Sequence, residues 1–228
     1  MKFMKKHKLP CLTKASQGIL HSSQDTSGEG LPSRKRCFEL LEQYRVPIHI
    51  RRHCITVAAL ATLLAHKLTR KAIPINTELV ERTCLLHDIL RVCDFDKIEP
   101  GYFRQKPGSD DTRIWQKLKN KYKHLTHEQA AYELFKKDYP KLAETIKKQQ
   151  YISMANEKTM PKTWEEKLAY YADMKVMHDK VVPLAERLDD AHKRNVHLHG
   201  SPQQSRINAA KVDPLIYELE KEILSACE

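Results

Sequence analysis

The sequence predicts an all-α protein, and three observations support this prediction. Its 228 residues include only six glycines, and few stretches alternate apolar and polar residues in the way that half-buried strands do. Apolar residues instead recur at spacings of three and four, the period of a helix with one buried face. No internal repeat and no convincing strand interrupts this pattern. We therefore expect one helical domain over residues 33–228, preceded by a flexible basic tail over residues 1–32.

The predicted tail is rich in Ser, Gln, Gly and Pro between residues 16 and 32. Residues 1–36 carry eight Lys or Arg against Asp25 and Glu29, so more than half of the net charge of +11 lies at this end. Such a charge can attract nucleic acid or an acidic membrane surface, although a solvated extension is the simpler interpretation. Because the segment lacks apolar periodicity, we expect its deletion to leave the folded domain intact.

The first helices are predicted from apolar faces and from signals at their ends. A short helix ends before Pro47, because the residue before a proline is pushed out of the α region. A longer helix over 50–68 follows, and its apolar face begins one turn after His53. Asn76 is the candidate N-cap of a third helix, which directs His87 inward near its end.

The second half of the domain is predicted as a polar segment followed by further helices. Residues 94–123 are expected to be irregular, and seven Lys or Arg within 104–123 could lie over a site for an anionic ligand. Capping boxes at Thr126 and Thr163 each begin a helix. Two more helices are expected, over 182–194 and from Asp213-Pro214 onward, where an N-cap aspartate precedes a proline.

Apolar runs and cysteines indicate the compartment. The longest apolar run, 55–65, falls short of the roughly 18 residues that span a bilayer, so we expect no membrane span. The six cysteines have no C-x-x-C spacing, and several lie on apolar helix faces, which favours a reducing environment. The N-terminal segment also lacks the apolar core of a secretory signal. A cytoplasmic location is the resulting expectation.

Four residues form a candidate metal site. His87 and Asp88 follow an apolar run, His53 lies upstream on a helix, and Asp173 lies at the edge of the apolar face of a later helix. A carboxylate near such a face must be paired, hydrogen-bonded or bound to metal, because burying an isolated charge is costly. A lone histidine such as His53 is more often a hydrogen-bonded core residue. Together, the two imidazoles and two carboxylates favour a divalent ion, which could be Mn, Fe, Co, Ni, Zn or Mg.

Three segments of the chain resemble a known family. His53, residues 85–91 and residues 171–173 resemble the H…HD…D pattern of the HD-domain metal-dependent phosphohydrolases. An HD dipeptide alone is weak evidence, but here four ligand positions occur in order on predicted helices. The resemblance covers about residues 38–195 and implies the all-α helical core of the HD domain.

The resemblance also implies a site and an activity. The implied metal ligands are His53, His87, Asp88 and Asp173. The implied reaction is hydrolysis of a phosphate ester by metal-activated water, with Asp88 also accepting the proton of that water. A nucleotide or another small phosphorylated metabolite is the expected substrate, and the resemblance does not distinguish a monoester from a diester.

Two further residues are candidates for catalysis. Residues 126–130 resemble a segment in which some family members carry an extra histidine for a second metal or for the phosphate, so His127 is a candidate, with His124 behind it. Where another such histidine would follow, residues 147–151 read Lys-Lys-Gln-Gln-Tyr, which leaves open whether one or two ions bind. Arg91 stands where the HD-x-x-K/R form of the motif carries a cation and could hold a phosphate oxygen; a solvated charge is the alternative.

Two other classes of function compete with hydrolysis. A degenerate HD module would bind a nucleotide, a nucleic acid or a partner without turnover; the missing histidine near Gln150 favours it and the four intact ligand positions oppose it. A nucleic-acid-binding protein would use the basic tail and the 104–123 segment, where aromatic residues for stacking are few. Lys175 and the basic residues of 104–123 are candidates for neutralising a phosphate.

Overall fold

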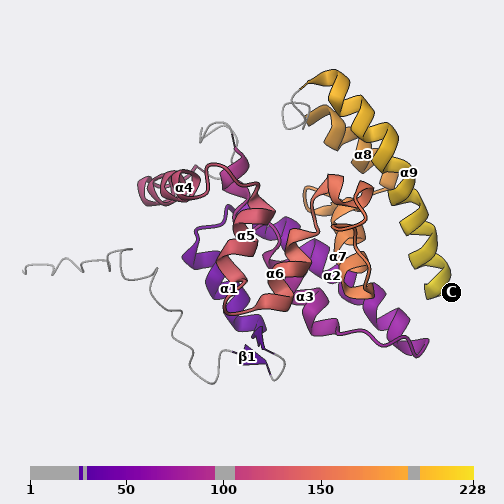
Figure 1. The fold of residues 1–228 in the computed structure, drawn as a ribbon. Coiled ribbons are helices and arrows are strands. Elements are labelled where there is room, and N and C mark those ends of the chain that lie inside the picture. The colour runs from indigo at the N-terminus through magenta and orange to yellow at the C-terminus, as the bar shows by residue number, and fades with distance from the viewer. Residues whose placement is uncertain (1–25, 28–29, 96–105, 195–200) are drawn as a thin grey trace, which may run out of the picture.

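The described residues of the computed structural model, 26–27, 30–95, 106–194 and 201–228, form nine α-helices with short connections (Figure 1). The all-α prediction is confirmed. Strands are limited in this part of the chain to two antiparallel hairpins, each made of two-residue strands, which the sequence did not indicate. These hairpins pair β1 (Thr26–Ser27) with β2 (Leu31–Pro32) and β3 (Val176–Met177) with β4 (Lys180–Val181).

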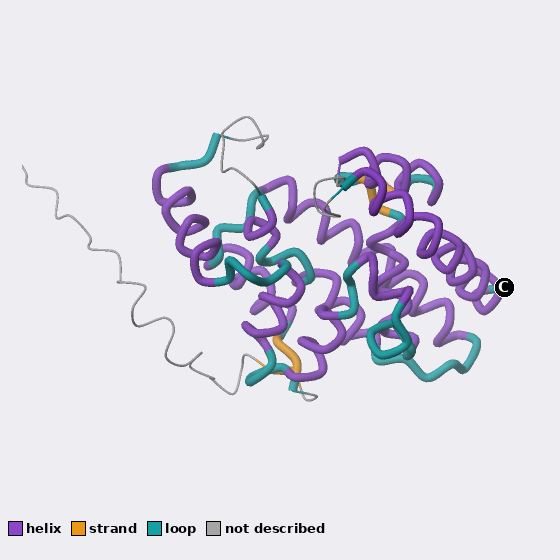
Figure 2. Tube along the Cα trace, turned by 45° about the horizontal axis from the view of Figure 1, so that its top comes forward, coloured by secondary structure: helices purple, strands orange, loops and turns teal. Residues whose placement is uncertain are grey.

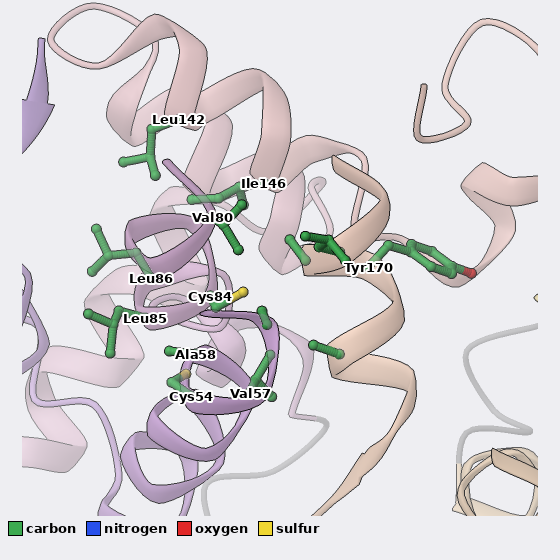
Figure 3. Close-up of a cluster of buried hydrophobic side chains, with 14 of the residues drawn as sticks. Cys54, Val57, Ala58, Val80, Cys84, Leu85, Leu86, Leu142, Ile146 and Tyr170 are labelled. Atoms are coloured by element: carbon green, nitrogen blue, oxygen red, sulfur yellow. The ribbon is translucent and has the colours of Figure 1, made fainter. Parts of the chain in front are cut away.

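Three helices form the centre of the molecule and pack against one another: α2 (Ile48–Arg70), α3 (Thr77–Leu86) and α7 (Trp164–Met174). Figure 3 shows their shared core, in which Cys54, Cys84 and Tyr170 meet apolar side chains of the other helices. Around this centre, α1 (Arg34–Gln43) and α6 (Pro140–Lys147) pack on α3, and α5 (His127–Phe135) packs on α6.

The remaining elements lie at the periphery. α8 (Leu184–Arg194) and α9 (Pro202–Cys227) contact each other on one side of the molecule, and α4 (Ser109–Lys121) lies on the other side, an arrangement also visible in Figure 2. Two short 3₁₀ helices, η1 (Arg91–Asp94) and η3 (Tyr151–Ala155), connect these outer helices to the centre.

Local capping signals predicted several helix starts. The side chain of Asn76 accepts the backbone N–H of Leu79 at 2.9 Å and begins α3. Thr126 and Thr163 begin α5 and α7 through the predicted capping boxes. These ends depend on residues three apart in the sequence, which is why they could be recognised without tertiary information.

The expectation of an irregular 94–123 segment is wrong for residues 109–121, which form α4. Gly108 offers no side chain as an N-cap; its backbone N–H instead donates to Asp111 Oδ2 at 3.0 Å. Trp115 is buried at 3% exposure, and its indole N–H donates to the carbonyl of Arg45 at 2.8 Å. A mostly polar sequence therefore forms a helix in which Trp115 is the buried residue, with Ile114 and Leu118 packed beside it.

The predicted helix start at Asp213-Pro214 is also wrong, because α9 runs continuously through Pro214. Ser201 caps it instead, accepting the backbone N–H of Gln204 at 3.1 Å. The carboxylate of Asp213 has other partners: it accepts the hydroxyl of Tyr151 at 2.6 Å and lies 2.9 Å from His192 Nε2. These contacts involve residues distant in sequence, so the Asp-Pro pair alone was misleading.

The last two residues of the predicted tail belong to the folded part. Leu31 is 1% exposed, and the Pro32 carbonyl accepts a hydrogen bond from Arg82 Nε at 3.2 Å. A deletion of residues 1–32 would therefore remove core contacts, contrary to the expectation that it leaves the domain intact. Most of the tail, residues 1–25, lies outside the described residues, as do residues 195–200.

Helix α2 is long and apolar enough to cross a membrane by the criteria of length and composition, with a mean hydropathy of 1.2. This helix is longer than the 55–65 run on which the expectation of no span was based. One such helix is weak evidence for a membrane protein, because core helices pass the same test. Here Cys54, Val57 and Ala61 pack into the central core.

Candidate metal centre

The end of α3 places His87 and Asp88 together. α3 ends at Leu86, and His87 and Asp88 lie in the turn that leads to η1. Successive residues of a helix point about 100° apart, so two neighbours converge on one point only where the helix stops. Because α3 ends at Leu86, His87 and Asp88 can both face the same point.

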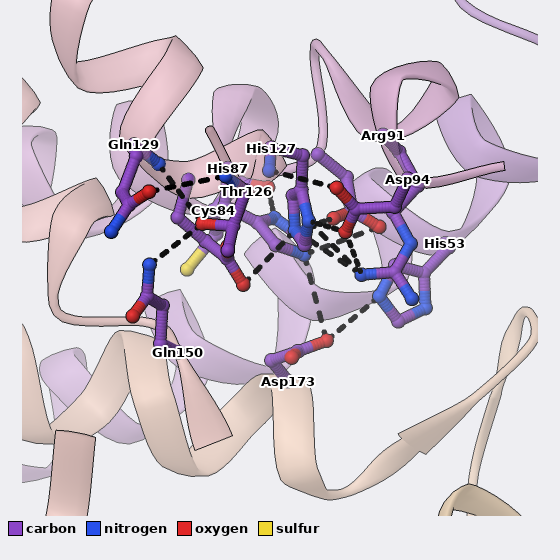
Figure 4. A network of polar contacts seen from close by, with 12 residues as sticks. His53, Cys84, His87, Arg91, Asp94, Thr126, His127, Gln129, Gln150 and Asp173 are labelled. Atoms are coloured by element: carbon purple, nitrogen blue, oxygen red, sulfur yellow. Dashed lines mark hydrogen bonds and ion pairs between the residues drawn. The ribbon is translucent and has the colours of Figure 1, made fainter. Parts of the chain in front are cut away.

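Side chains from α2 and α7 complete the group (Figure 4). His53 Nε2 lies 2.8 Å from Asp173 Oδ1, and His87 Nε2 lies 3.5 Å from the same oxygen. His87 Nε2 is also 3.8 Å from Asp88 Oδ2. One ligand atom each from His53, His87 and Asp88 lie within 4.8 Å of one another, so this group could hold a metal ion.

Backbone carbonyls fix the orientation of both imidazoles. His53 Nδ1 donates to the carbonyl of His178, and His87 Nδ1 donates to the carbonyl of Cys84, both at 2.8 Å. A carbonyl can only accept, so the Nδ1 atoms carry protons and the Nε2 atoms point toward the carboxylates. Metal-binding histidines commonly have this arrangement, in which the outer N–H is held by an oxygen.

The chemistry of this donor set fits a divalent cation. His87 is 3% exposed, and its Nε2 is buried without a hydrogen-bond partner in the described structure. Burial would lower the pKa of His87, but the combined influence of Asp88, Cys54 and Asp173 raises that pKa well above its usual value. Burial would likewise raise the pKa of Asp173, yet the hydrogen bond with His53 and the neighbouring imidazole of His87 hold it well below its usual range. The carboxylates thus favour positive charge between these side chains, which a metal can supply.

A second cluster surrounds His127 at the start of α5. Its Nε2 lies 2.9 Å from Asp88 Oδ1 and 3.2 Å from Glu128 Oε1, and its Nδ1 lies 2.5 Å from Asp94 Oδ2. The backbone N–H of His127 also donates to Asp94 Oδ1 at 3.0 Å. Burial lowers the pKa of His127, but Glu128 and the other carboxylates raise it to about 10. His127 is therefore an imidazolium whose two nitrogens already face carboxylates.

Arg91 belongs to the same cluster. Its Nη1 lies 3.7 Å from Asp94 Oδ2 and 3.2 Å from the ring nitrogens of His127. Burial would lower the pKa of Arg91, but the charges of Asp88, Asp94 and Glu128 raise it. The guanidinium thus has its charge compensated by the protein's own carboxylates.

Both clusters line a cavity of about 1240 Å³. Its wall continues from the metal-binding group to α8 through Arg187, Leu188 and His192, and to η3 through Tyr151 and Ile152. His124 and Gln150 also line it, and Gln150 Nε2 donates to Thr126 Oγ1 at 2.7 Å. A ligand in this cavity would therefore contact aromatic and apolar groups as well as charged ones.

Two expected basic contributions are not found at the cavity. Lys175 Nζ pairs with Glu220 Oε1 at 3.1 Å and is not among the lining residues. Among the described part of 104–123, only Lys123 reaches the wall, because α4 lies to one side. Charge content alone could not reveal where these side chains would lie.

Sequence analysis missed three residues that shape the site. Asp94 follows Asp88 by six positions, so the two would lie on different faces of a continuous helix. The turn after α3 and the 3₁₀ helix η1 place Asp94 next to His127 instead. Glu128 was not singled out, although its Oε1 lies 3.2 Å from His127 Nε2. Arg187 was not singled out either, although its position on α8 brings it to the cavity.

An all-α core with a His/Asp group at the end of a central helix, open to a large cavity, defines a candidate metal-dependent protein. Residues 50–189, more than half of the chain, match the model of the HD domain. The chain therefore belongs to the HD-domain family, whose members are commonly metal-dependent phosphohydrolases. Searches of curated proteins and of solved structures gave no match.

Proposed function

We propose that this protein is a metal-dependent phosphohydrolase that cleaves a phosphate ester of a nucleotide or another small phosphorylated metabolite. One observation carries the proposal: ligand atoms of His53, His87 and Asp88 gather within 4.8 Å at the wall of a large cavity, and the Nε2 of His87 lacks a hydrogen-bond partner. Buried polar atoms without partners are rare unless a ligand, ion or water completes them.

The proposed ligands are His53, His87, Asp88 and Asp173. Asp173 is included because its Oδ1 faces the Nε2 atoms of both histidines, at 2.8 and 3.5 Å. When bound, a divalent ion would supply Lewis acidity, which polarises a phosphoryl oxygen and makes water easier to deprotonate. The two backbone carbonyls behind the histidines would keep the imidazoles in place during this chemistry.

Asp88 would connect the metal to the proton transfer. Its Oδ2 faces His87 at 3.8 Å and its Oδ1 faces His127 at 2.9 Å, so the two oxygens can serve different partners. One oxygen would bind the metal while the carboxylate accepts the proton of the attacking water. His127 would hold Asp88 in this position through the 2.9 Å contact between its Nε2 and Asp88 Oδ1.

The cavity supports a substrate larger than phosphate. Its volume of about 1240 Å³ lies above the roughly 300–1,000 Å³ that is usual for sites of small organic ligands. Tyr151, Ile152 and Leu188 add apolar and aromatic surface to its charged wall. This combination suits an ester with an anionic phosphate and an organic group, such as a nucleotide.

The direct test is metal analysis of protein purified without chelator, followed by a screen of nucleotides and other phosphate esters with Mn, Mg, Co and Ni. We expect hydrolysis that a chelator abolishes and that added metal restores. A protein that holds metal and binds nucleotides but hydrolyses none of the panel would instead be a binding module. A protein that neither holds metal nor hydrolyses any ester would contradict the proposal.

The binding module is the second candidate, and one observation favours it. Where a second additional histidine could serve another metal, Gln149 is buried and Gln150 contacts Thr126.

A nucleic-acid partner for the basic tail is a further proposal, and most of that segment lies outside the described residues. The five cysteines in the described part of the chain are all free, which supports our proposal of a cytoplasmic location.

A further inference from the structure

We infer that Arg187, rather than Arg91, is the residue that holds a phosphate oxygen of the substrate. Arg187 comes from the first turn of α8, and both arginines line the cavity. This role rests on the phosphohydrolase function proposed above, since it places the phosphate of that substrate at the cavity wall formed by α8. The two guanidinium groups differ in the partners that the protein already gives them.

The guanidinium of Arg187 is anchored at one side and unsatisfied at the other. Its Nε donates to the carbonyl of Val176 at 2.8 Å, which fixes the side chain against β3. Its Nη1 is buried and has no hydrogen-bond partner, and no carboxylate of the described residues forms an ion pair with it. A buried, oriented N–H without an acceptor is costly, so a ligand oxygen is the natural partner.

Arg91 lacks this capacity. Three carboxylates, those of Asp88, Asp94 and Glu128, already act on its charge, and its Nη1 packs against the ring of His127. A phosphate at Arg91 would meet the negative charge of these three carboxylates. In Arg187, the hydrogen bond to Val176 uses Nε, and the buried Nη1 is left without an acceptor.

Arg187 is also on the correct wall. Burial lowers its pKa, and the strongest opposing influence is the negative charge of Asp173, a proposed metal ligand. The arginine and the metal-binding group therefore act on the same region of the cavity. Arginine suits this task because its planar N–H groups match the geometry of phosphate oxygens.

The experiment titrates inorganic phosphate calorimetrically into Mn-loaded protein, with the metal content of each variant measured beforehand. Arg187→Gln should weaken phosphate binding by about 10- to 100-fold while metal content stays at the wild-type level. The matched control is Arg194→Gln, since Arg194 also lines the cavity but is paired with Asp190 at 2.6 Å. That control should change phosphate affinity by less than about 3-fold, the size expected for an exposed charge.

Several outcomes would overturn the inference. They are wild-type phosphate affinity in Arg187→Gln, no phosphate binding by the metal-loaded wild type, and loss of metal together with phosphate binding. If Arg187→Gln does not fold, Arg187→Lys takes its place. Lysine keeps the positive charge but lacks the planar N–H groups of the guanidinium, so we expect phosphate binding about 3- to 10-fold weaker than in wild type. Wild-type phosphate affinity in Arg187→Lys would overturn the role.

The same titration separates the inference from the function on which it rests. A wild type that hydrolyses no ester, combined with weakened phosphate binding in Arg187→Gln, would remove the proposed activity and keep Arg187 as an anion-binding residue. A wild type that hydrolyses esters, combined with unchanged phosphate binding in Arg187→Gln, would keep the activity and remove Arg187.

Discussion

The polar centre has two halves that use the same residue types in opposite ways. In the first half, His53, His87 and Asp173, each imidazole directs its Nδ1 proton outward to a carbonyl and its Nε2 inward. In the second half, His127 with Asp94 and Glu128, both imidazole nitrogens face carboxylates. We call the first the open half, because the buried Nε2 of His87 has no hydrogen-bond partner there. We call the second the closed half, because both nitrogens of His127 are paired with carboxylates. Histidine and aspartate content therefore does not define a metal site; the direction of the imidazole nitrogens does.

Asp88 contacts both halves, so we expect its replacement to have the largest effect. Asp88→Asn nearly preserves shape but removes a proposed anionic ligand and the proposed proton acceptor. Most of the metal should be lost, and hydrolysis should fall by at least about 100-fold, the low end for a general base. Metal analysis and rate measurements check this result. Equal activity in wild type and Asp88→Asn would point to a contaminating phosphatase.

The next test compares one histidine from each half. In wild type, metal at about 100 times its dissociation constant should stabilise the fold by about 2.7 kcal/mol and raise Tm by about 5–10 °C. His87→Gln should lose this shift, because its Nε2 is the unpartnered atom of the open half. His127→Gln should keep most of it while turnover slows. Thermal unfolding with and without metal measures both variants; equal losses would remove the distinction between the halves.

A smaller effect is expected at Asp94, a member of the closed half whose ion pairs are with His127 and Arg91. Asp94→Asn retains hydrogen-bonding atoms but removes the charge that holds His127. Metal content should stay unchanged while kcat falls by about 10-fold or less, because the proposed ligands are intact. Asp189→Asn, on the exposed face of α8, is the control. Loss of metal in Asp94→Asn would show that the closed half also binds the ion.

The smallest effect on activity is expected at Glu166, remote from both halves. Burial would raise the pKa of Glu166, but the hydrogen bond from Lys148 and backbone N–H donors at Lys162 and Thr163 hold it below its usual value. A carboxylate with a depressed folded-state pKa stabilises the fold above its unfolded pKa, and this contribution is lost as pH falls through the folded-state pKa.

Glu166→Gln should accordingly lower the free energy of unfolding by about 1.5–3 kcal/mol at pH 7, the usual value of hydrogen bonds to a charged group. The difference from wild type should shrink as pH falls below about 4.3, the unfolded reference. Urea unfolding at pH 7, 5 and 3 measures this dependence, with metal-dependent turnover at pH 7 as the control for the site. A difference independent of pH would contradict the role assigned to the carboxylate.

Much of the helical fold could be predicted because its signals are local. Asn76 and the two capping boxes act over three residues, and the apolar face of α2 repeats with the helical period. α4 was missed because it starts at Gly108 without a side-chain cap and depends on Trp115 reaching the carbonyl of Arg45. Such a tertiary contact leaves no mark in the spacing of residues.

The same limit applies to the candidate site. The sequence indicated the residue types of the metal-binding group and the helix end that brings His87 and Asp88 together. It did not indicate Asp94, whose return to His127 depends on the turn and on η1. Nor did it distinguish Arg91 from Arg187, because the difference lies in which acceptors surround each guanidinium.

The hairpin of β3 and β4 has a consequence for how the protein can change. His178 lies in its two-residue turn with a φ of 57°, and its carbonyl accepts the Nδ1 proton of His53. Every amino acid carries that carbonyl, so the acceptor persists whatever side chain stands at 178, provided that the left-handed conformation is kept. Glycine adopts this conformation readily, and proline cannot adopt it. The orientation of His53 is thus robust to most substitutions in the turn and vulnerable to an insertion or deletion that changes its length.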